Sequence, residues 1–322
     1  MQQSRATAQQ AIQHSVKLAQ RAEALGYKRF WVAEHHGSTL NAGSAPEVLV
    51  AHILAKTSHI RVGSGGVMLQ HYSPYKVAEV FKVLSALAPG RVDLGVGKAP
   101  GGLPLSTRAL QVGRTPARKL SFDRLLADLD AFLHNQLPED HALAGAVATP
   151  QPASLPECTL LGAAPESALL AARHGWGFCY AGHFNGDPAN LVHALDAYRQ
   201  ASGREPSVAL YAFAAADRDQ ARERVGALRI FKLHLATGQS VNLPSAEAAE
   251  EFARQASVVD YRIEETQPHV IAGTAEDVLA ALDELHERHG IQEFVIDTPV
   301  AQFADRLASV ELLAPHQQAV AA

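Results

Sequence analysis

Cysteines, long apolar runs and excess positive charge are all scarce in this 322-residue sequence. Only two cysteines occur, Cys158 and Cys179, and their spacing argues against a disulfide framework and a zinc knuckle. No apolar run approaches the roughly 18 residues that span a bilayer, and residues 1–10 lack the apolar core of a signal peptide. The 28 basic and 33 acidic side chains give a formal charge of −5, which does not favour nucleic-acid binding. These absences predict a cytoplasmic protein without a membrane or nucleic-acid partner.

The chain does contain a regular alternation of short β-branched or aromatic runs with segments of helical periodicity. Residues 30–33 form such a run, after a helical segment with Ile12, Val16 and Ala19 on one face. Gly26 lies between the two and is suited to end a helix. This alternation predicts a parallel sheet with helices packed outside it. We expect seven strands, at residues 30–33, 60–69, 91–97, 159–162, 178–181, 208–213 and 294–296.

Capping residues and insertions set the limits of several elements. Ser44 and Glu47 have the spacing of a capping box, and Thr274 is placed to cap a later helix. Residues 99–118 and 217–268 are expected to be insertions, the second of them made of helices and loop. The chain is therefore predicted to be a single domain, residues 1–322, that carries these two insertions.

The number of strands favours one α/β architecture over another. A doubly wound sheet usually has about five or six strands, whereas a (β/α)8 TIM barrel has eight. Seven strands preceded by a helix predict a TIM barrel whose first strand is missing from this sequence, with an insertion before the last β/α unit. We expect the DNA upstream of the Met1 codon to encode, in frame, a β-rich segment of about eight to fifteen residues.

The end of the first expected strand carries the most distinctive polar residues. In a barrel, function belongs to the C-terminal ends of the strands, and Glu34, His35 and His36 follow residues 30–33 directly. Neighbouring residues of a strand point to opposite faces, so the two histidines do not converge on one ion, and no metal site is predicted. One imidazole facing the barrel mouth suits acid–base work or hydrogen bonding to a ligand. The alternative is a strand end that simply becomes polar.

Three further strand ends carry glycine, a cation or a helix start. Ser64, Gly65 and Gly66 indicate either close approach of the backbone to a ligand or a bulge. Lys98 is placed to pair with an anion or to remain solvated. Residues 162–167 join a strand to a helix, whose first amides are able to hold a phosphate, although every such junction offers this.

These segments together resemble the bacterial luciferase-like flavin monooxygenase superfamily. The resemblance covers nearly the whole chain and is most specific between residues 25 and 102. Its motifs are residues 25–36 (LGYKRFWVAEHH), 45–47 (APE), 60–69 (IRVGSGGVML), 89–97 (PGRVDLGVG), 273–274 (GT) and 312–314 (LLA).

The resemblance also implies roles for single residues. His35 would be the active-site histidine beside the reactive edge of the flavin, with His36 as its neighbour. Gly65 and Gly66 stand, after Ser64, where relatives often have a non-prolyl cis peptide bond under the isoalloxazine ring. Lys98 replaces a phosphate-binding arginine and keeps the charge without the bidentate fork. The loop that would bind the FMN phosphate contains Ala163, Ala164 and Ser167, and the two alanines replace hydroxyl residues, which predicts weak FMN retention.

The activity that the resemblance implies is an oxygen-incorporating oxidation. A flavin reductase would supply reduced FMN, oxygen would form a flavin 4a-hydroperoxide, and a small organic substrate would be oxidised. The alternatives are a deazaflavin-dependent hydride-transfer oxidoreductase and a non-catalytic flavin-binding homologue. The resemblance further implies a homodimer packed through helices early in the chain.

Overall fold

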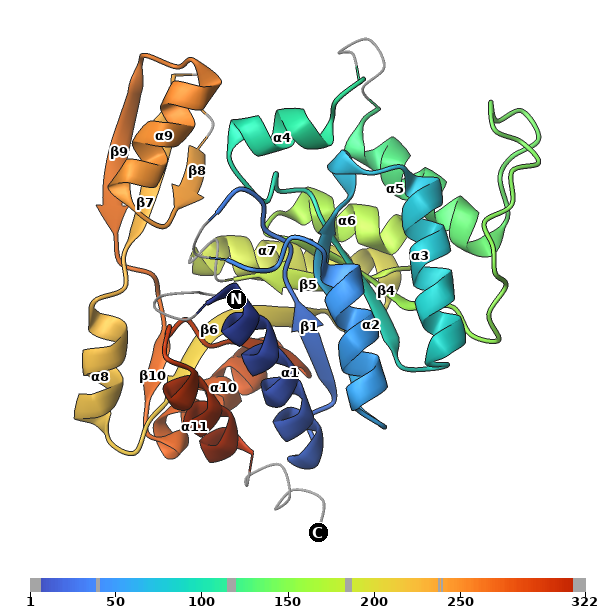
Figure 1. Cartoon of the computed structure of the whole chain (residues 1–322). Coiled ribbons are helices and arrows are strands. Elements are labelled where there is room, and N and C mark those ends of the chain that lie inside the picture. Colours follow the sequence, from blue (N-terminus) through green and yellow to red (C-terminus); the bar gives the residue numbers. More distant parts are fainter. Residues whose placement is uncertain are drawn as a thin grey trace.

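The computed structural model describes residues 7–38, 41–114, 120–182, 187–236, 238 and 240–314. Eight parallel strands form one sheet within the described residues. Helices flank this sheet (Figure 1). This confirms the predicted α/β class, and a strand occurs at each of the seven expected places. In spatial order they are β1 (Arg29–Val32), β2 (Arg61–Met68), β3 (Val92–Gly97), β4 (Glu157–Gly162), β5 (Gly177–Ala181), β6 (Ser207–Ala214) and β11 (Phe294–Asp297). The short strand β10 (Ile271–Gly273), which was not predicted, pairs with the second half of β6.

The helices follow the strands in the alternation that the sequence predicts. In the part of the chain that is described, no helix is both long and apolar enough to cross a membrane. The helices are α1 (Ala8–Ala24), α2 (Pro46–Lys56), η1 (Leu69–His71), α3 (Pro74–Leu87), α4 (Pro104–Leu110), α5 (Phe122–His134), α6 (Pro165–Arg173), α7 (Pro188–Ser202), α8 (Arg218–Gly226), α9 (Ala246–Ala256), α10 (Ala275–His289) and α11 (Phe303–Leu313).

The two predicted helix starts have different outcomes. Thr274 caps α10 in a complete capping box, as expected. The expected capping box at Ser44 is wrong, because α2 begins at Pro46 with Ala45 as its cap residue and no side-chain cap. A proline disfavours helical conformation in the residue before it, so the helix cannot start as early as the Ser44 spacing requires.

The inserted region contains a second sheet. Strands β7 (Ile230–Leu235), β8 (Ser240–Leu243) and β9 (Tyr261–Thr266) form it, with β7 in the centre and antiparallel to both neighbours. The expectation that this region holds only helices and loop was therefore wrong. Phe231, Leu233 and Leu235 alternate with polar residues, which is the pattern of a half-buried strand. In Figure 1 this sheet and α9 stand beside α4, and the Gln255 side chain accepts a hydrogen bond from the Leu105 amide at 2.8 Å.

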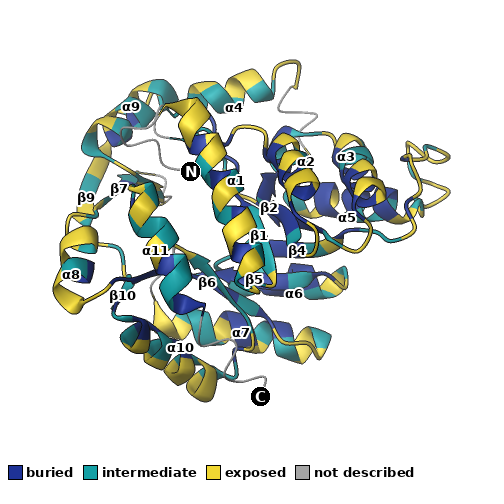
Figure 2. Cartoon of the chain, turned by 60° about the horizontal axis from the view of Figure 1, so that its bottom comes forward, coloured by how far each residue is buried: buried dark blue, intermediate teal, exposed yellow. Residues whose placement is uncertain are grey.

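Strands β1 and β11 lie at opposite edges of the parallel sheet, and ion pairs connect their N-terminal ends. Within the described residues they do not pair with each other. Glu293, just before β11, forms ion pairs with Lys28 at 2.9 Å and with Arg29 at 2.6 Å. Helices α1 and α11 lie side by side (Figures 1 and 2), and the Tyr27 hydroxyl donates to the Val310 carbonyl at 2.9 Å. The encoded strand expected upstream of Met1 remains a prediction.

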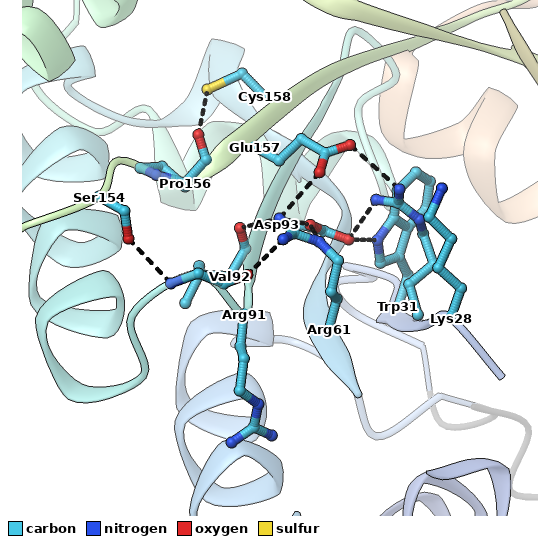
Figure 3. A network of polar contacts seen from close by, with 12 residues as sticks. Lys28, Trp31, Arg61, Arg91, Val92, Asp93, Ser154, Pro156, Glu157 and Cys158 are labelled. Atoms are coloured by element: carbon cyan, nitrogen blue, oxygen red, sulfur yellow. Dashed lines mark hydrogen bonds and ion pairs between the residues drawn. The ribbon is translucent and has the colours of Figure 1, made fainter. Parts of the chain in front are cut away.

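A buried ionic network fills the N-terminal half of the inner sheet face, which is the face turned away from α2 and α3. Asp93 is 0% exposed and accepts hydrogen bonds from Trp31 at 2.8 Å and from Arg61 at 2.8 Å (Figure 3). It also accepts one from Arg29 at 2.7 Å. Glu157 pairs with the same two arginines. Burial by itself would lower the pKa of Arg29, but Asp93 and its acidic neighbours raise it. The guanidinium therefore stays charged. The network lies at the N-terminal ends of β1–β4 and supports the C-terminal ends of the same strands.

Candidate active site

The segment Ser64-Gly65-Gly66 lies against β1 and β3, and its packing requires glycine. In register, Trp31 pairs with Gly63, and a Cβ atom on Gly65 would lie 3.1 Å from the Trp31 side chain. A Cβ atom on Gly66 would lie 2.8 Å from the Gly95 carbonyl, which is too close for any other residue. The Gly65–Gly66 peptide bond is cis, as the resemblance implied.

The two histidines after β1 differ in burial, which agrees with the predicted alternation of side chains. Glu34 and His36 are buried on the helix-covered face, like Val32, whereas His35 is half-buried on the face that carries Trp31. Both backbones are held in place: the His35 amide donates to the Gly43 carbonyl at 2.8 Å, and the His36 amide to the Gly101 carbonyl at 2.7 Å. Because His36 is buried and His35 is only half-buried, His35 is the better candidate of the two for contact with a ligand.

Glu34 is the centre of a buried hydrogen-bond cluster. Its side chain is almost fully buried, and Oε1 accepts from His36 Nε2 and from the Tyr72 hydroxyl, each at 2.7 Å. Oε2 accepts the Met68 amide at 3.1 Å. Burial and the bond to Glu34 raise the pKa of Tyr72, so its hydroxyl stays a donor. Sequence reasoning missed Tyr72, although it follows the strand at 60–69 and the rule for strand ends applies to it.

His71 occupies the same cluster and links it to the segment after β3. Its Nε2 lies 2.7 Å from the Pro100 carbonyl, and the Gln111 side-chain amide lies 3.1 Å from Nδ1. The carbonyl only accepts and the amide nitrogen only donates, so the ring is neutral with its hydrogen on Nε2. Burial lowers the pKa of His71, in agreement with that assignment. The His36 and His71 rings meet edge to face with centroids 6.0 Å apart.

The expected phosphate site combines residues from two neighbouring strand ends. Gly97 pairs with Leu161 across β3 and β4, so Lys98 emerges next to residues 162–164. Lys98 is exposed and forms no ion pair with a described residue. Helix α6 begins without a side-chain cap at Ala164, and a Cβ atom on Gly162 would lie 2.7 Å from Ser167 Oγ. An ammonium, a hydroxyl and uncapped helix amides are the donors that suit a phosphate.

Asn190, which sequence reasoning missed, holds this loop in place from helix α7. The Asn190 side-chain amide, from α7, donates to the Ala163 carbonyl at 2.6 Å and to the Tyr180 hydroxyl at 2.9 Å. It therefore fixes the backbone of the loop, where the two alanines offer only main-chain groups. No sequence pattern connects Asn190 with residues 162–167, because only the packing of α7 against α6 brings them together.

Comparison with known proteins identifies the family. The luciferase-like monooxygenase profile matches residues 1–293, which is most of the chain. The chain belongs to this family. An N-acetyl-S-alkylcysteine monooxygenase of Bacillus subtilis (strain 168) is 44% identical over 312 residues, covering 95% of this chain and 92% of that protein.

Two solved structures have a fold similar to that of this chain. Crystalline apo-MsnO8 has 33% identity and a TM-score of 0.75, covering 98% of this chain and 94% of its own. The oxygenating constituent of 3,6-diketocamphane monooxygenase from Pseudomonas putida, in complex with FMN, has 18% identity and a TM-score of 0.69. It covers 98% of this chain and 94% of its own, and at that identity it supports the fold alone.

Proposed function

We propose that this luciferase-like monooxygenase binds FMN at the C-terminal ends of β1–β4 and oxidises a small organic substrate with molecular oxygen. The observation that carries the proposal is the position of Lys98 beside residues 162–167, at the end of the sheet where His35 and Gly65–Gly66 also lie. The proposal includes a separate reductase that supplies reduced FMN in the cytoplasm, and a homodimer.

Each candidate residue then has a definite task. Lys98, the Ser167 hydroxyl and the first amides of α6 bind the phosphate, and Asn190 keeps that loop in place. The backbone of Ser64, Gly65 and Gly66 supports the ring system, and the His35 imidazole holds or moves a proton at its edge. Reduced FMN, when bound, supplies two electrons, so that one atom of O₂ enters the substrate and the other leaves as water.

The substrate class to test first is a thioether on an N-acylated amino acid. This choice rests on the 44% identical relative, which is named for N-acetyl-S-alkylcysteine. The non-catalytic alternative is supported by Ala163 and Ala164, which lack the hydroxyl groups expected at a phosphate loop.

Replacing Lys98 tests the phosphate site. We expect Lys98→Ala to weaken FMN binding about ten- to hundredfold, because a charge-assisted hydrogen bond is worth roughly 1.5–3 kcal/mol. Lys98→Arg is expected to bind at least as tightly as the native protein. Titration of each variant with FMN and with a deazaflavin, followed by fluorescence quenching, measures the affinity for each cofactor. The exposed Lys76, which pairs with Glu79 on α3, provides the control variant Lys76→Ala. Equal affinities of Lys98→Ala and Lys76→Ala would contradict the assignment.

Restoring hydroxyl groups to the phosphate loop is expected to tighten binding. The native protein should purify nearly colourless, whereas Ala163→Ser with Ala164→Ser should bind FMN about tenfold more tightly or better. Each neutral hydrogen bond contributes on the order of 0.5–1.5 kcal/mol. Equilibrium dialysis gives both affinities, with Ala55→Ser on the exposed side of α2 as the control. Native protein that keeps stoichiometric FMN through extensive dialysis would refute the expectation of loose binding.

A further inference from the structure

We propose that Glu34 is a positioning residue, which holds His35, Gly65–Gly66 and Lys98 in one fixed arrangement without touching the cofactor. The inference rests on the proposed function and deepens it. Glu34 would act by joining the end of β1 to the end of β2, and through His36 and His71 to the segment that follows β3.

The groups around Glu34 suit a buried carboxylate. A charge buried to 1% exposure is costly unless it is paired and hydrogen-bonded. The hydroxyl of Tyr72 and the backbone amide of Met68 donate to it, and His36 donates as well in the tautomer that carries its hydrogen on Nε2. They suit an ionised carboxylate. The Met68 amide lies two residues beyond Gly66, so the Glu34 side chain bridges the strand ends beside the candidate ring support.

His36 and His71 connect Glu34 to the segment that carries Lys98. His36 donates its ring hydrogen to Glu34 and its amide hydrogen to the Gly101 carbonyl. A Cβ atom on Gly102 would lie 2.4 Å from the His36 carbonyl oxygen, so the two backbones are in direct contact. His71 binds Pro100 and Gln111 in the same segment. The C-terminal ends of β1, β2 and β3, which carry candidate flavin contacts, are therefore held together by hydrogen bonds and backbone contact.

Glu34 and His36 flank His35 in the sequence and differ from it in burial. Glu34 and His36 are buried on the helix-covered side, and His35 lies between them in sequence on the inner side. The cluster thus fixes the backbone of the residues before and after His35 from the helix-covered side of the sheet. A displacement of His35 by about 1 Å can lower the rate on the order of 10²-fold, so loss of Glu34 is expected to lower the rate.

Comparing Glu34→Gln with a matched carboxylate elsewhere tests the proposal. Glutamine keeps the shape, but its amide nitrogen only donates, so at least one of the three donors loses its acceptor. Glu23 is the control, because its carboxylate also has three hydrogen-bond partners, the backbone amides of Ser58, His59 and Ile60, at the other end of β2. We expect Glu34→Gln to weaken FMN binding about tenfold or more and to lower kcat, with KM for the organic substrate nearly unchanged. Glu23→Gln should leave all three quantities unchanged.

Hydrogen–deuterium exchange of the cofactor-free protein provides a readout that needs no activity. The His36 and Met68 amides are expected to lose protection together in Glu34→Gln, and to keep it in Glu23→Gln. If Glu34→Gln does not fold, Tyr72→Phe, which leaves the carboxylate paired with His36 and Met68, should show the same two changes in milder form. Native protein without flavin affinity would overturn the proposed function and leave the exchange result to decide on the cluster. Unchanged exchange and FMN affinity in both variants would overturn the role of Glu34.

Discussion

His35→Ala is expected to lower the rate of substrate oxidation by about 10²–10⁴-fold while the protein stays folded. A positioned acid–base group contributes this much to a rate, far more than a packing contact does. His35 is half-buried on the inner face, and its backbone is held by the Gly43 carbonyl, which the substitution does not remove. The rate of product formation after rapid mixing with reduced FMN, oxygen and substrate gives the effect directly.

Two further histidine variants separate chemistry from structure. His36→Ala removes a donor to buried Glu34, so it should lower stability and disturb the orientation of His35. His52→Ala, on the exposed side of α2, should behave as the native protein does. A His35→Ala variant whose oxidation rate equals that of His52→Ala would exclude His35 from the chemistry, and the non-catalytic or deazaflavin alternative would then gain support.

Asp93→Ala is expected to destabilise the fold by about 3–5 kcal/mol, the usual cost of breaking a buried ion pair from one side. The substitution leaves Arg29 without its most buried partner and takes an acceptor from Trp31 and Arg61. Glu157 and Glu293 still contact the arginines, but both are more exposed than Asp93. The free energy of unfolding is the urea concentration at the midpoint multiplied by the slope of the transition, and the difference between the native and variant values is the free energy lost.

Asp123→Ala is the matched control for this measurement. Its carboxylate is 62% exposed and lies 4.0 Å from Arg173, so the change should stay within about 0.5 kcal/mol. A loss below about 1 kcal/mol for Asp93→Ala would mean that the remaining carboxylates compensate, and that the network does not stabilise the strand ends above it.

The local pattern of the sequence determined the parallel sheet and part of the site. The strand period places successive side chains on opposite faces, so Glu34-His35-His36 was sufficient to predict that the two imidazoles diverge. The alternation of elements likewise predicted the strands whose ends carry Lys98 and Gly65–Gly66. Both signals depend on the backbone repeat alone, which a single sequence displays.

Only the tertiary structure decided which side chains pair across those strand ends. The bond between Tyr72 and Glu34 spans 38 positions, and that between His71 and Pro100 spans 29. Neither follows from a repeat, because strand register and burial are set when separate segments pack. The same holds for Asn190 beside Ala163, where α7 must dock before the contact exists. The sequence thus predicted which residue types lie at each strand end. The cluster that fixes their positions forms only when the strands lie side by side.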